Sequence, residues 1–405
     1  MDARSYLEQV VYTRSEAANW LTGTNTGYIA EKYDSDIGWV PHAGHFKHGI
    51  DGANCEYTYE ASGARRMTLF ADRPCRINTY GNSFTHCDQV SDGETWQERL
   101  AAHLCEPIRN FGVSGHSVYQ MYVRMKREES RTPAKYIILN IYSDDHTRSL
   151  CGWAGMTTLR PKTAGQVVRR PTNPYVKANP ANKEFVELPN CCPTPESLFN
   201  LCDLDWVYEH FKDDFRLKLV VARENIKQKT PEKSYGTISA LAEEQGMPAQ
   251  IDSAESLMAT TEKIHMRAAI YSTMRIVEKV EEFATAHQKK VLYVLSYTVA
   301  HAAAALKSGR RLDQDLVDFL DRKGLPYVDD LKAHQADWAN FKFGVDDYLK
   351  RYYIGHYNPL GNFFQAFAIK DKLAEMLEPK PLAYPDATGR STTMSEEVVN
   401  PGGLH

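Results

Sequence analysis

The run KYIILNIY, residues 135–142, decides the fold. Its side chains are almost all apolar, and it has the length of a strand rather than of a helix. A strand that is apolar on both sides is typical of a parallel sheet whose two faces are covered by helices. This run therefore predicts the centre of such a sheet.

Strand-like and helix-like runs alternate on both sides of this central strand. Other strands are predicted at 75–80, 107–113, 290–297 and 325–330. Helices are predicted at 94–104, 116–130, 254–288 and 360–377. Alternation of this kind with short connections indicates a doubly wound sheet. We expect an α/β fold with a flavodoxin-like, mostly parallel five-stranded sheet and helices on both faces.

Three segments depart from this alternation. Residues 1–70 are predicted to be an N-terminal extension or cap. They have a helical start at about 4–21, followed by short aromatic, strand-like segments that are separated by Gly, Pro and Asp. Residues 71–379 are predicted to be the main domain, and 146–253 to be an insertion that overhangs the sheet edge as a lid. Residues 380–405 are rich in Pro, Gly, Ser and Thr and are predicted to be disordered.

The composition is that of an ordinary soluble globular protein: 405 residues, 42% hydrophobic and 25% charged. A net charge of −4 does not suggest a nucleic-acid partner. We see no apolar run long enough to cross a membrane and no export signal at the start. The eight cysteines show no metal-type spacing, so reduced thiols and a cytoplasmic location are expected. The sequence leaves the oligomeric state open.

No cofactor is predicted. The sequence has no Walker or dinucleotide-binding glycine pattern. His42, His45 and His48 could reach one ion from a Gly- and Pro-containing loop, but we expect no acidic or Cys ligand to complete a metal site with them. We therefore expect neither a nucleotide nor a metal ion.

A polar turn after the first predicted strand contains a candidate nucleophile. The strand at 75–80 ends at Gly81-Asn82-Ser83, at the edge where doubly wound sheets bind ligands. Ser83 is either a nucleophile or simply a turn or helix-cap residue. His356 stands in a Gly-, Asn- and Pro-rich loop before the last helix. The predicted topology brings this loop to the same edge, where the imidazole could act as a base.

Other candidate groups follow the neighbouring strands. Gly115 precedes a helix start, where unpaired backbone N–H groups could stabilise an oxyanion, although it could also only permit a turn. Asp144 and Asp145 follow the strand at 135–142, either as site residues or as ordinary acidic loop residues. All of these groups are expected at one edge of the sheet.

Three of these stretches resemble sequence blocks of the SGNH hydrolase superfamily, also called GDSL-type esterases and lipases. The family's Gly-Asp-Ser-x-Thr block is similar to residues 81–85, its oxyanion-glycine block to 110–117, and its histidine block to 356–362. Order and spacing agree over roughly 73–146 and 290–377. The stretch near 38–63 also resembles N-terminal additions of some bacterial members.

The resemblance implies an SGNH-type sheet and a role for each matching residue. Ser83 would be the nucleophile, His356 the base and Gly115 an oxyanion donor. The family also has an asparagine after the third strand that donates to the oxyanion, and the matching residue here is Asp144. A protonated Asp144 could donate as asparagine does, whereas an ionised one would repel the oxyanion and leave the backbone N–H groups to form the hole.

A second departure concerns the acid that orients the base. The family has an aspartate three residues before the histidine, and this chain has Tyr353 there. The acid could come from elsewhere, or a backbone carbonyl could orient His356 and leave a Ser–His dyad. The candidate acids are Asp329, Asp330 and Asp347.

The start of the insertion is locally basic, with no acidic residue between Thr147 and Lys183. The basic residues are Arg148, Arg160, Lys162, Arg169, Arg170, Lys177 and Lys183. They form either an ordinary solvated face or a lid that attracts an anionic substrate, such as an acidic sugar or a carboxylated ester. Arg148 is nearest the strand edge, and we expect it to contact the substrate together with Asn82 and Asp145.

The resemblance thus implies a serine-dependent hydrolase of carboxylic esters that works through an acyl-enzyme. The expected substrate is a small-molecule or carbohydrate ester, for example an O-acetyl group or an anionic ester. Two alternatives stay open. An acyltransferase could use the same serine, or the chain could be a non-catalytic binding protein on this fold, because Asp144 and Tyr353 depart from the family pattern.

Overall fold

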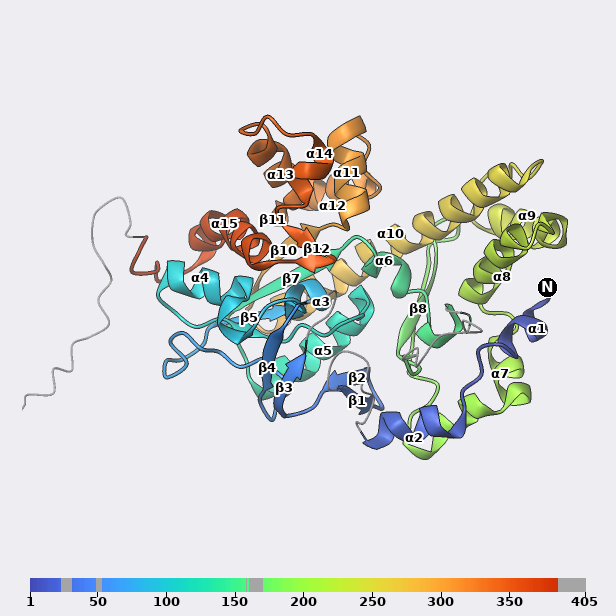
Figure 1. The fold of residues 1–405 in the computed structure, drawn as a ribbon, viewed down its shortest axis with the longest axis horizontal. Coiled ribbons are helices and arrows are strands. Elements are labelled where there is room, and N and C mark those ends of the chain that lie inside the picture. The colour runs from blue at the N-terminus through green and yellow to red at the C-terminus, as the bar shows by residue number, and fades with distance from the viewer. Residues whose placement is uncertain (23–30, 49–52, 158, 160–169, 385–405) are drawn as a thin grey trace, which may run out of the picture.

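The computed structural model describes residues 1–22, 31–48, 53–157, 159 and 170–384. A five-stranded parallel sheet forms its centre (Figure 1). In chain order its strands are β5 (Ile77–Tyr80), β6 (Arg109–Asn110), β7 (Tyr136–Tyr142), β10 (Lys290–Ser296) and β11 (Tyr327–Asp329). In space the order is β6-β5-β7-β10-β11, which is a doubly wound arrangement. The predicted α/β fold with a parallel sheet is confirmed.

Strand β7 lies at the centre, as its apolar sequence predicts. It pairs with β5 from Tyr136 to Leu139 and with β10 along its whole length. All of its residues are buried. Such a strand needs cover on both sides, and helices supply it.

The helices between and after the strands cover both faces of the sheet. One face is covered by α4 (Trp96–Leu104) and α15 (Pro359–Met376), and the other by α5 (Val118–Arg131), α10 (Ala254–Ala286) and α12 (Gln314–Lys323). Three more helices follow β10: α11 (Val299–Ser308), α13 (Asp330–Trp338) and α14 (Val345–Leu349). Helix α4 starts where the Thr95 side chain accepts a hydrogen bond from the Glu98 N–H at 3.3 Å.

The side chains of β7 alternate between these two layers, as the pleat of a strand requires. Ile137, Leu139 and Ile141 pack in the cluster with α5, α10 and α12. Tyr136 and Ile138 pack in the cluster with α4 and α15. The core therefore consists of two apolar layers, one on each side of the sheet.

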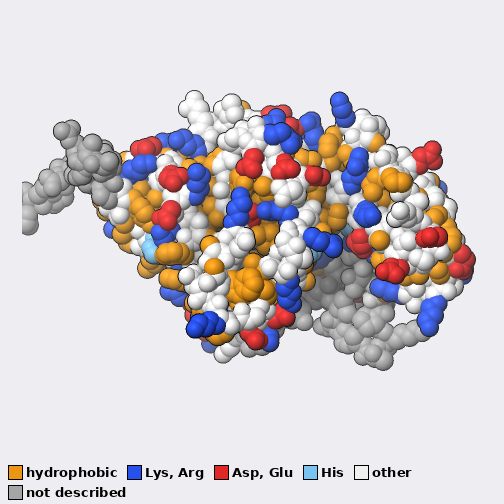
Figure 2. Space-filling view, turned by 90° about the horizontal axis from the view of Figure 1, so that it is seen from above, with side chains coloured by type: hydrophobic (Ala, Val, Ile, Leu, Met, Phe, Trp, Pro, Cys, Tyr) orange, Lys and Arg blue, Asp and Glu red, His pale blue; other side chains and the backbone are white. Residues whose placement is uncertain are grey.

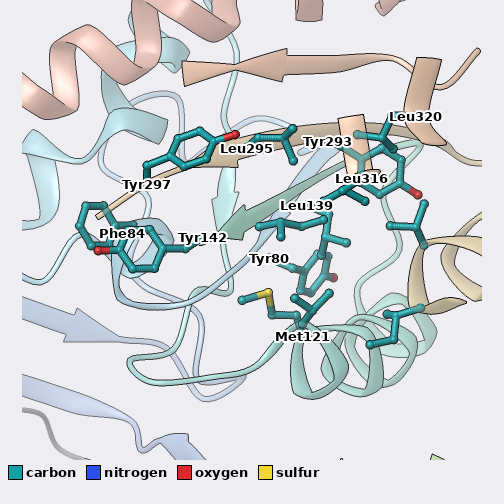
Figure 3. Close-up of a cluster of buried hydrophobic side chains, with 14 of the residues drawn as sticks. Tyr80, Phe84, Met121, Leu139, Tyr142, Tyr293, Leu295, Tyr297, Leu316 and Leu320 are labelled. Atoms are coloured by element: carbon teal, nitrogen blue, oxygen red, sulfur yellow. The ribbon is translucent and has the colours of Figure 1, made fainter. Parts of the chain in front are cut away.

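Figure 3 shows part of the first of these layers. Leu139 lies between Tyr80 of β5 and Tyr293 of β10, and Met121 of α5 approaches from below the sheet. At the end of the sheet, the rings of Phe84 and Tyr142 are stacked with their centroids 4.1 Å apart. This stacked pair leads from the core to the edge at which the predicted site residues lie.

Two sequence predictions differ in extent from the structure. The strand expected at 107–113 is limited to Arg109–Asn110, although the Phe111 and Val113 N–H groups still donate to the Thr79 and Gly81 carbonyls at 2.9 and 3.0 Å. The helix expected at about 4–21 is divided into α1 (Ala3–Leu7) and α2 (Arg14–Thr22).

The remaining strands of the N-terminal part form two antiparallel pairs. These are β1 (Glu31–Asp34) with β2 (Gly38–Pro41) and β3 (Gly44–His48) with β4 (Cys55–Tyr59). Between β7 and α10 the chain forms α6 (Asp145–Arg148), the hairpin β8 (Tyr175–Asn179)–β9 (Glu184–Leu188), α7 (Leu204–Phe211), α8 (Phe215–Lys227) and α9 (Tyr235–Glu244).

The N-terminal helices share a second core with this inserted segment. Tyr6 and Trp20 belong to the same buried cluster as Trp153, Phe211 and Leu217. The backbone N–H of Tyr12 donates to the Leu201 carbonyl at 2.8 Å. Figure 1 shows α1 beside α7, at the end of the molecule away from α4. Two segments that are far apart in sequence thus fold against each other.

The face of the molecule drawn in Figure 2 is mixed in charge. Figure 2 shows basic and acidic side chains interspersed with hydrophobic ones on the face that it presents. In the described part of the chain, no helix is both long and apolar enough to span a bilayer. Most of the tail predicted to be disordered, residues 385–405, lies outside the described residues.

Candidate active site

Ser83 lies at the C-terminal end of β5, as the first residue of the short helix α3 (Ser83–His86). The preceding residue, Asn82, is the helix cap, and its side chain accepts a hydrogen bond from the Phe84 N–H at 2.8 Å. Gly81 packs so tightly that a Cβ would come within 1.8 Å of the Thr85 hydroxyl. Because Asn82 does the capping, the Ser83 hydroxyl does not have to.

The structure brings His356 to this serine. Its Nε2 lies 2.8 Å from the Ser83 Oγ, although the two residues are 273 positions apart in the sequence. His356 begins the short strand β13 (His356–Tyr357), which pairs with β12 (Tyr353–Ile354). The His356 backbone N–H donates to the Gln89 side chain at 2.9 Å, and the Phe84 ring lies 4.8 Å from the imidazole. The imidazole is therefore held in place from two sides.

Two backbone N–H groups at this edge are available for an oxyanion. Among the described residues, neither the Ser83 N–H nor the Gly115 N–H finds a hydrogen-bond acceptor. Gly115 has a φ of +74°, a conformation that favours glycine. The loop before it is fixed by Asn110, whose side chain donates to the Thr85 carbonyl at 2.8 Å and accepts from the Gly112 N–H at 2.9 Å.

The two aspartates after β7 lie in different environments. The Asp144 carboxylate is about half exposed and lies 3.8 Å from the Arg148 guanidinium. Asp145 is fully buried and accepts hydrogen bonds from Asn82 Nδ2 at 2.9 Å and Arg148 Nη1 at 2.6 Å. Burial raises the pKa of Asp145 to about 7, although Arg148 and Asn82 act in the opposite direction. Of the two aspartates, Asp145 is therefore the buried one, and Asp144 is the one that borders solvent.

Asn82 and Asp145 do not line any described cavity, since their side chains are buried against each other. The sequence predicted that both would contact the substrate. Asn82 caps the helix that begins with Ser83 and Asp145 holds Asn82, and contact of either residue with a substrate stays a prediction. Of the residues predicted to contact the substrate, Arg148 is the one that lines the large cavity described below.

None of the predicted acids pairs with His356 in the described structure. Asp329 accepts hydrogen bonds from Arg311 at 2.7 Å and from the Leu331 N–H at 3.1 Å. Asp330 is buried beside Tyr357 and Gln365, and Asp347 is an exposed partner of Lys350. Tyr353, which stands where the family has its aspartate, lies 3.3 Å from His334 and 3.3 Å from the Tyr357 hydroxyl.

Within the described ranges, Asp88 places a carboxylate beside His356, and the sequence patterns did not predict it. Its Oδ2 lies 4.0 Å from His356 Nε2. It also pairs with His86 and accepts hydrogen bonds from the Ser114 hydroxyl at 2.7 and 2.8 Å. Burial by itself would raise the pKa of Asp88, but His86, His356 and Ser114 outweigh it and hold this pKa below its ordinary value. A buried negative charge therefore lies next to the imidazole.

A cavity of about 700 Å³ borders this edge of the sheet. Gly115 and Asp144 line it on the side of the sheet, and Arg216 and Arg223 of α8 and His265 of α10 line the side of the insertion. The insertion therefore forms one wall of a hollow beside the predicted site. Ser83 and His356 are not among the residues that line this cavity.

The basic residues at the start of the insertion are dispersed. Arg148 and Arg170 line the cavity, and Arg170 pairs with Glu31 and lies over the Trp39 ring. Lys177 and Lys183 belong to the β8–β9 hairpin, are exposed, and do not line the cavity. Arg160, Lys162 and Arg169 lie outside the described residues.

No family model matches the sequence, and no curated protein matches it. Among solved structures, the chain is similar to a member of the lipolytic protein G-D-S-L family from Veillonella parvula DSM 2008. The TM-score is 0.34 and the sequence identity 11%, over 73% of this chain and 96% of that chain. A similarity of this size adds no weight to the geometry described above.

Proposed function

We propose that this protein is a serine-dependent hydrolase of carboxylic esters of the SGNH class. The observation that supports this most directly is the 2.8 Å contact between Ser83 Oγ and His356 Nε2. This is the distance at which a base can take the proton of a nucleophile. The contact lies at the carboxyl edge of a doubly wound sheet, where such proteins bind their ligands.

In the proposed reaction, Ser83 Oγ attacks the ester carbonyl while His356 Nε2 accepts its proton. The Ser83 and Gly115 N–H groups, which are open in the described structure, stabilise the oxyanion of the tetrahedral intermediate. The intermediate then collapses to an acyl-enzyme. The alcohol departs and takes the proton from His356. Water, deprotonated by His356, releases the carboxylic acid and regenerates the serine.

We propose that the Asp88 carboxylate supports His356 during this reaction. When His356 accepts the proton it becomes an imidazolium, and the Asp88 carboxylate, 4.0 Å from Nε2, favours that positive charge. Asp88 is thus a positioning and charge-balancing residue. Asp144 is half exposed beside Arg148, so the proposed oxyanion hole consists of backbone N–H groups.

A fluorophosphonate probe tests the nucleophile. The probe should label Ser83 in the native protein, and labelling should disappear in Ser83→Ala while the protein stays folded. The matched control is Ser130→Ala, which changes an exposed serine of α5 and should be labelled like the native protein. Labelling of Ser83→Ala at another residue would contradict the proposal.

A further inference from the structure

The wall of the cavity formed by the insertion contains a compact cationic cluster. Arg216 and Arg223 stand about two turns apart on α8 and therefore share a face of that helix. Between them and α10 lies His265. Arg216 Nη1 is 2.9 Å from His265 Nε2, and Arg223 Nη2 is 3.1 Å from His265 Nδ1. All three side chains line the cavity.

His265 does not supply a counter-charge to this cluster. Burial, together with the two guanidinium groups, holds its pKa well below the ordinary value, so the imidazole is neutral. A neutral imidazole accepts a hydrogen bond through one nitrogen only. It can therefore satisfy only part of the N–H groups that the two arginines direct at it.

The arginines of the cavity differ in whether a carboxylate neutralises them. Arg148 pairs with Asp144 at 3.8 Å and Asp145 at 2.6 Å, Arg170 pairs with Glu31, and Arg223 pairs with Glu262 at 2.9 Å. These three cations are therefore compensated by protein carboxylates. The exception is Arg216.

Arg216 has no carboxylate within ion-pair distance among the described residues, and its buried Nε has no hydrogen-bond partner there. The nearest acidic residue in sequence, Asp214, caps α8 by accepting from the Leu217 N–H at 2.9 Å. Burial lowers the pKa of Arg216, which reflects the cost of this charge. An uncompensated cation in such a place is expensive unless an anion joins it.

We infer that Arg216, with Arg223 and His265, forms a subsite for one carboxylate group of the ester substrate. One uncompensated charge matches one negative charge, and the planar guanidinium suits a planar carboxylate. The cavity runs from this subsite to Gly115 and Asp144 at the edge that bears Ser83, so an ester attacked by Ser83 can extend into it. This inference rests on the proposed ester hydrolysis, and it assigns the class of substrate: acidic esters.

Binding is tested first, without turnover, in Ser83→Ala. Benzoate and its neutral isostere benzamide are titrated by calorimetry. Benzoate should bind about tenfold or more tightly than benzamide, the size expected for charge-assisted hydrogen bonds. Arg216→Gln should remove this preference, Arg216→Lys should keep part of it, and Lys227→Gln, an exposed position on the same helix, should leave it intact. Equal binding of the two probes, or an unchanged preference in Arg216→Gln, would overturn the subsite.

Hydrolysis is then tested with 4-acetoxybenzoate and 4-acetoxybenzamide. The ratio of their kcat/KM values should favour the acid and fall about tenfold in Arg216→Gln. A ratio that Arg216→Gln leaves unchanged would show that the subsite does not serve the substrate. Absence of any hydrolysis, with benzoate binding intact, would instead overturn the esterase proposal and leave the carboxylate site standing. Thermal unfolding of Arg216→Gln checks folding, and we expect no loss of stability because a buried charge is removed.

Discussion

At the scale of single residues, the surroundings of His356 depend on a carboxylate from a turn close to Ser83. Cys87 adopts a left-handed conformation, with a φ of 70°, and the chain reverses there. Asp88 follows directly and lies beside His356, His86 and Ser114. The family's histidine motif covers only residues that are close to the histidine in sequence. It therefore does not detect Asp88, which comes from a segment close to Ser83.

We predict that Asp88→Asn lowers kcat by about 10- to 100-fold, since a charge about 4 Å away is worth a few kcal/mol in a protein. Steady-state hydrolysis measures the loss. Asp347→Asn, an exposed acid, is the control and should keep the native kcat. An undiminished kcat in Asp88→Asn would contradict a charge-balancing role.

Asp145 predicts a pH dependence of stability. Its pKa in the folded protein, about 7, is above the ordinary 3.8. The stability that it contributes is therefore fully present below about pH 4 and is lost as the pH rises through 7. In Asp145→Asn the difference in free energy of unfolding between pH 5 and pH 8 should be smaller than in the native protein. Urea unfolding at both pH values measures it, and an equal difference in both proteins would contradict the raised pKa.

Part of the candidate site can be predicted from sequence, and the reason is local. Ser83, Gly115 and His356 each stand in a short pattern that places them at a strand or helix end. Asp88 and Arg216 stand in no such pattern, since their importance depends on the neighbours that folding gives them. The sequence also does not reveal which of the two aspartates after β7, Asp144 or Asp145, is buried.

At the scale of elements, the short helix α3 depends on its cap. We predict that Asn82→Ala lowers the free energy of unfolding by about 0.5–2 kcal/mol and also lowers kcat, because Asn82 fixes the helix that begins with Ser83. Denaturant unfolding and ester hydrolysis measure the two effects. Thr298→Ala removes the cap of α11 and should lower stability without a matching loss of kcat. Full activity in Asn82→Ala would show that the cap does not position Ser83.

The elements themselves are predictable where the pattern is long. Strands β7 and β10 and helices α10 and α15 agree with the predicted runs to within a few residues, because their apolar periodicity is sustained. Strand β6 is shorter than predicted, and Gly112, just after it, packs so closely on His86 of α3 that a Cβ would come within 2.2 Å of the His86 backbone nitrogen. Contacts of this kind arise between elements and leave no periodic trace in the sequence.

At the scale of the whole molecule, the structure has a second core outside the sheet. We predict that Trp20→Ala, which empties a buried site between α2 and the insertion, lowers the free energy of unfolding by about 3–5 kcal/mol. Leu382→Ala, at a position that is 70% exposed, should have little effect. Thermal and urea unfolding measure both. Equal stability of the two variants would mean that the N-terminal helices do not stabilise the insertion.

This shared core also has a consequence for synthesis on the ribosome. The apolar faces of α1 and α2 emerge early, whereas their partners around Leu217 are made much later. At about 5–20 residues added per second, the interval is roughly 10–40 s. During that time Trp20 and its neighbours have no native surface to cover them. The nascent chain is thus expected to need a chaperone around α1 and α2, and ribosome-bound chains halted before residue 217 should be more readily cleaved by protease near Trp20 than the finished protein.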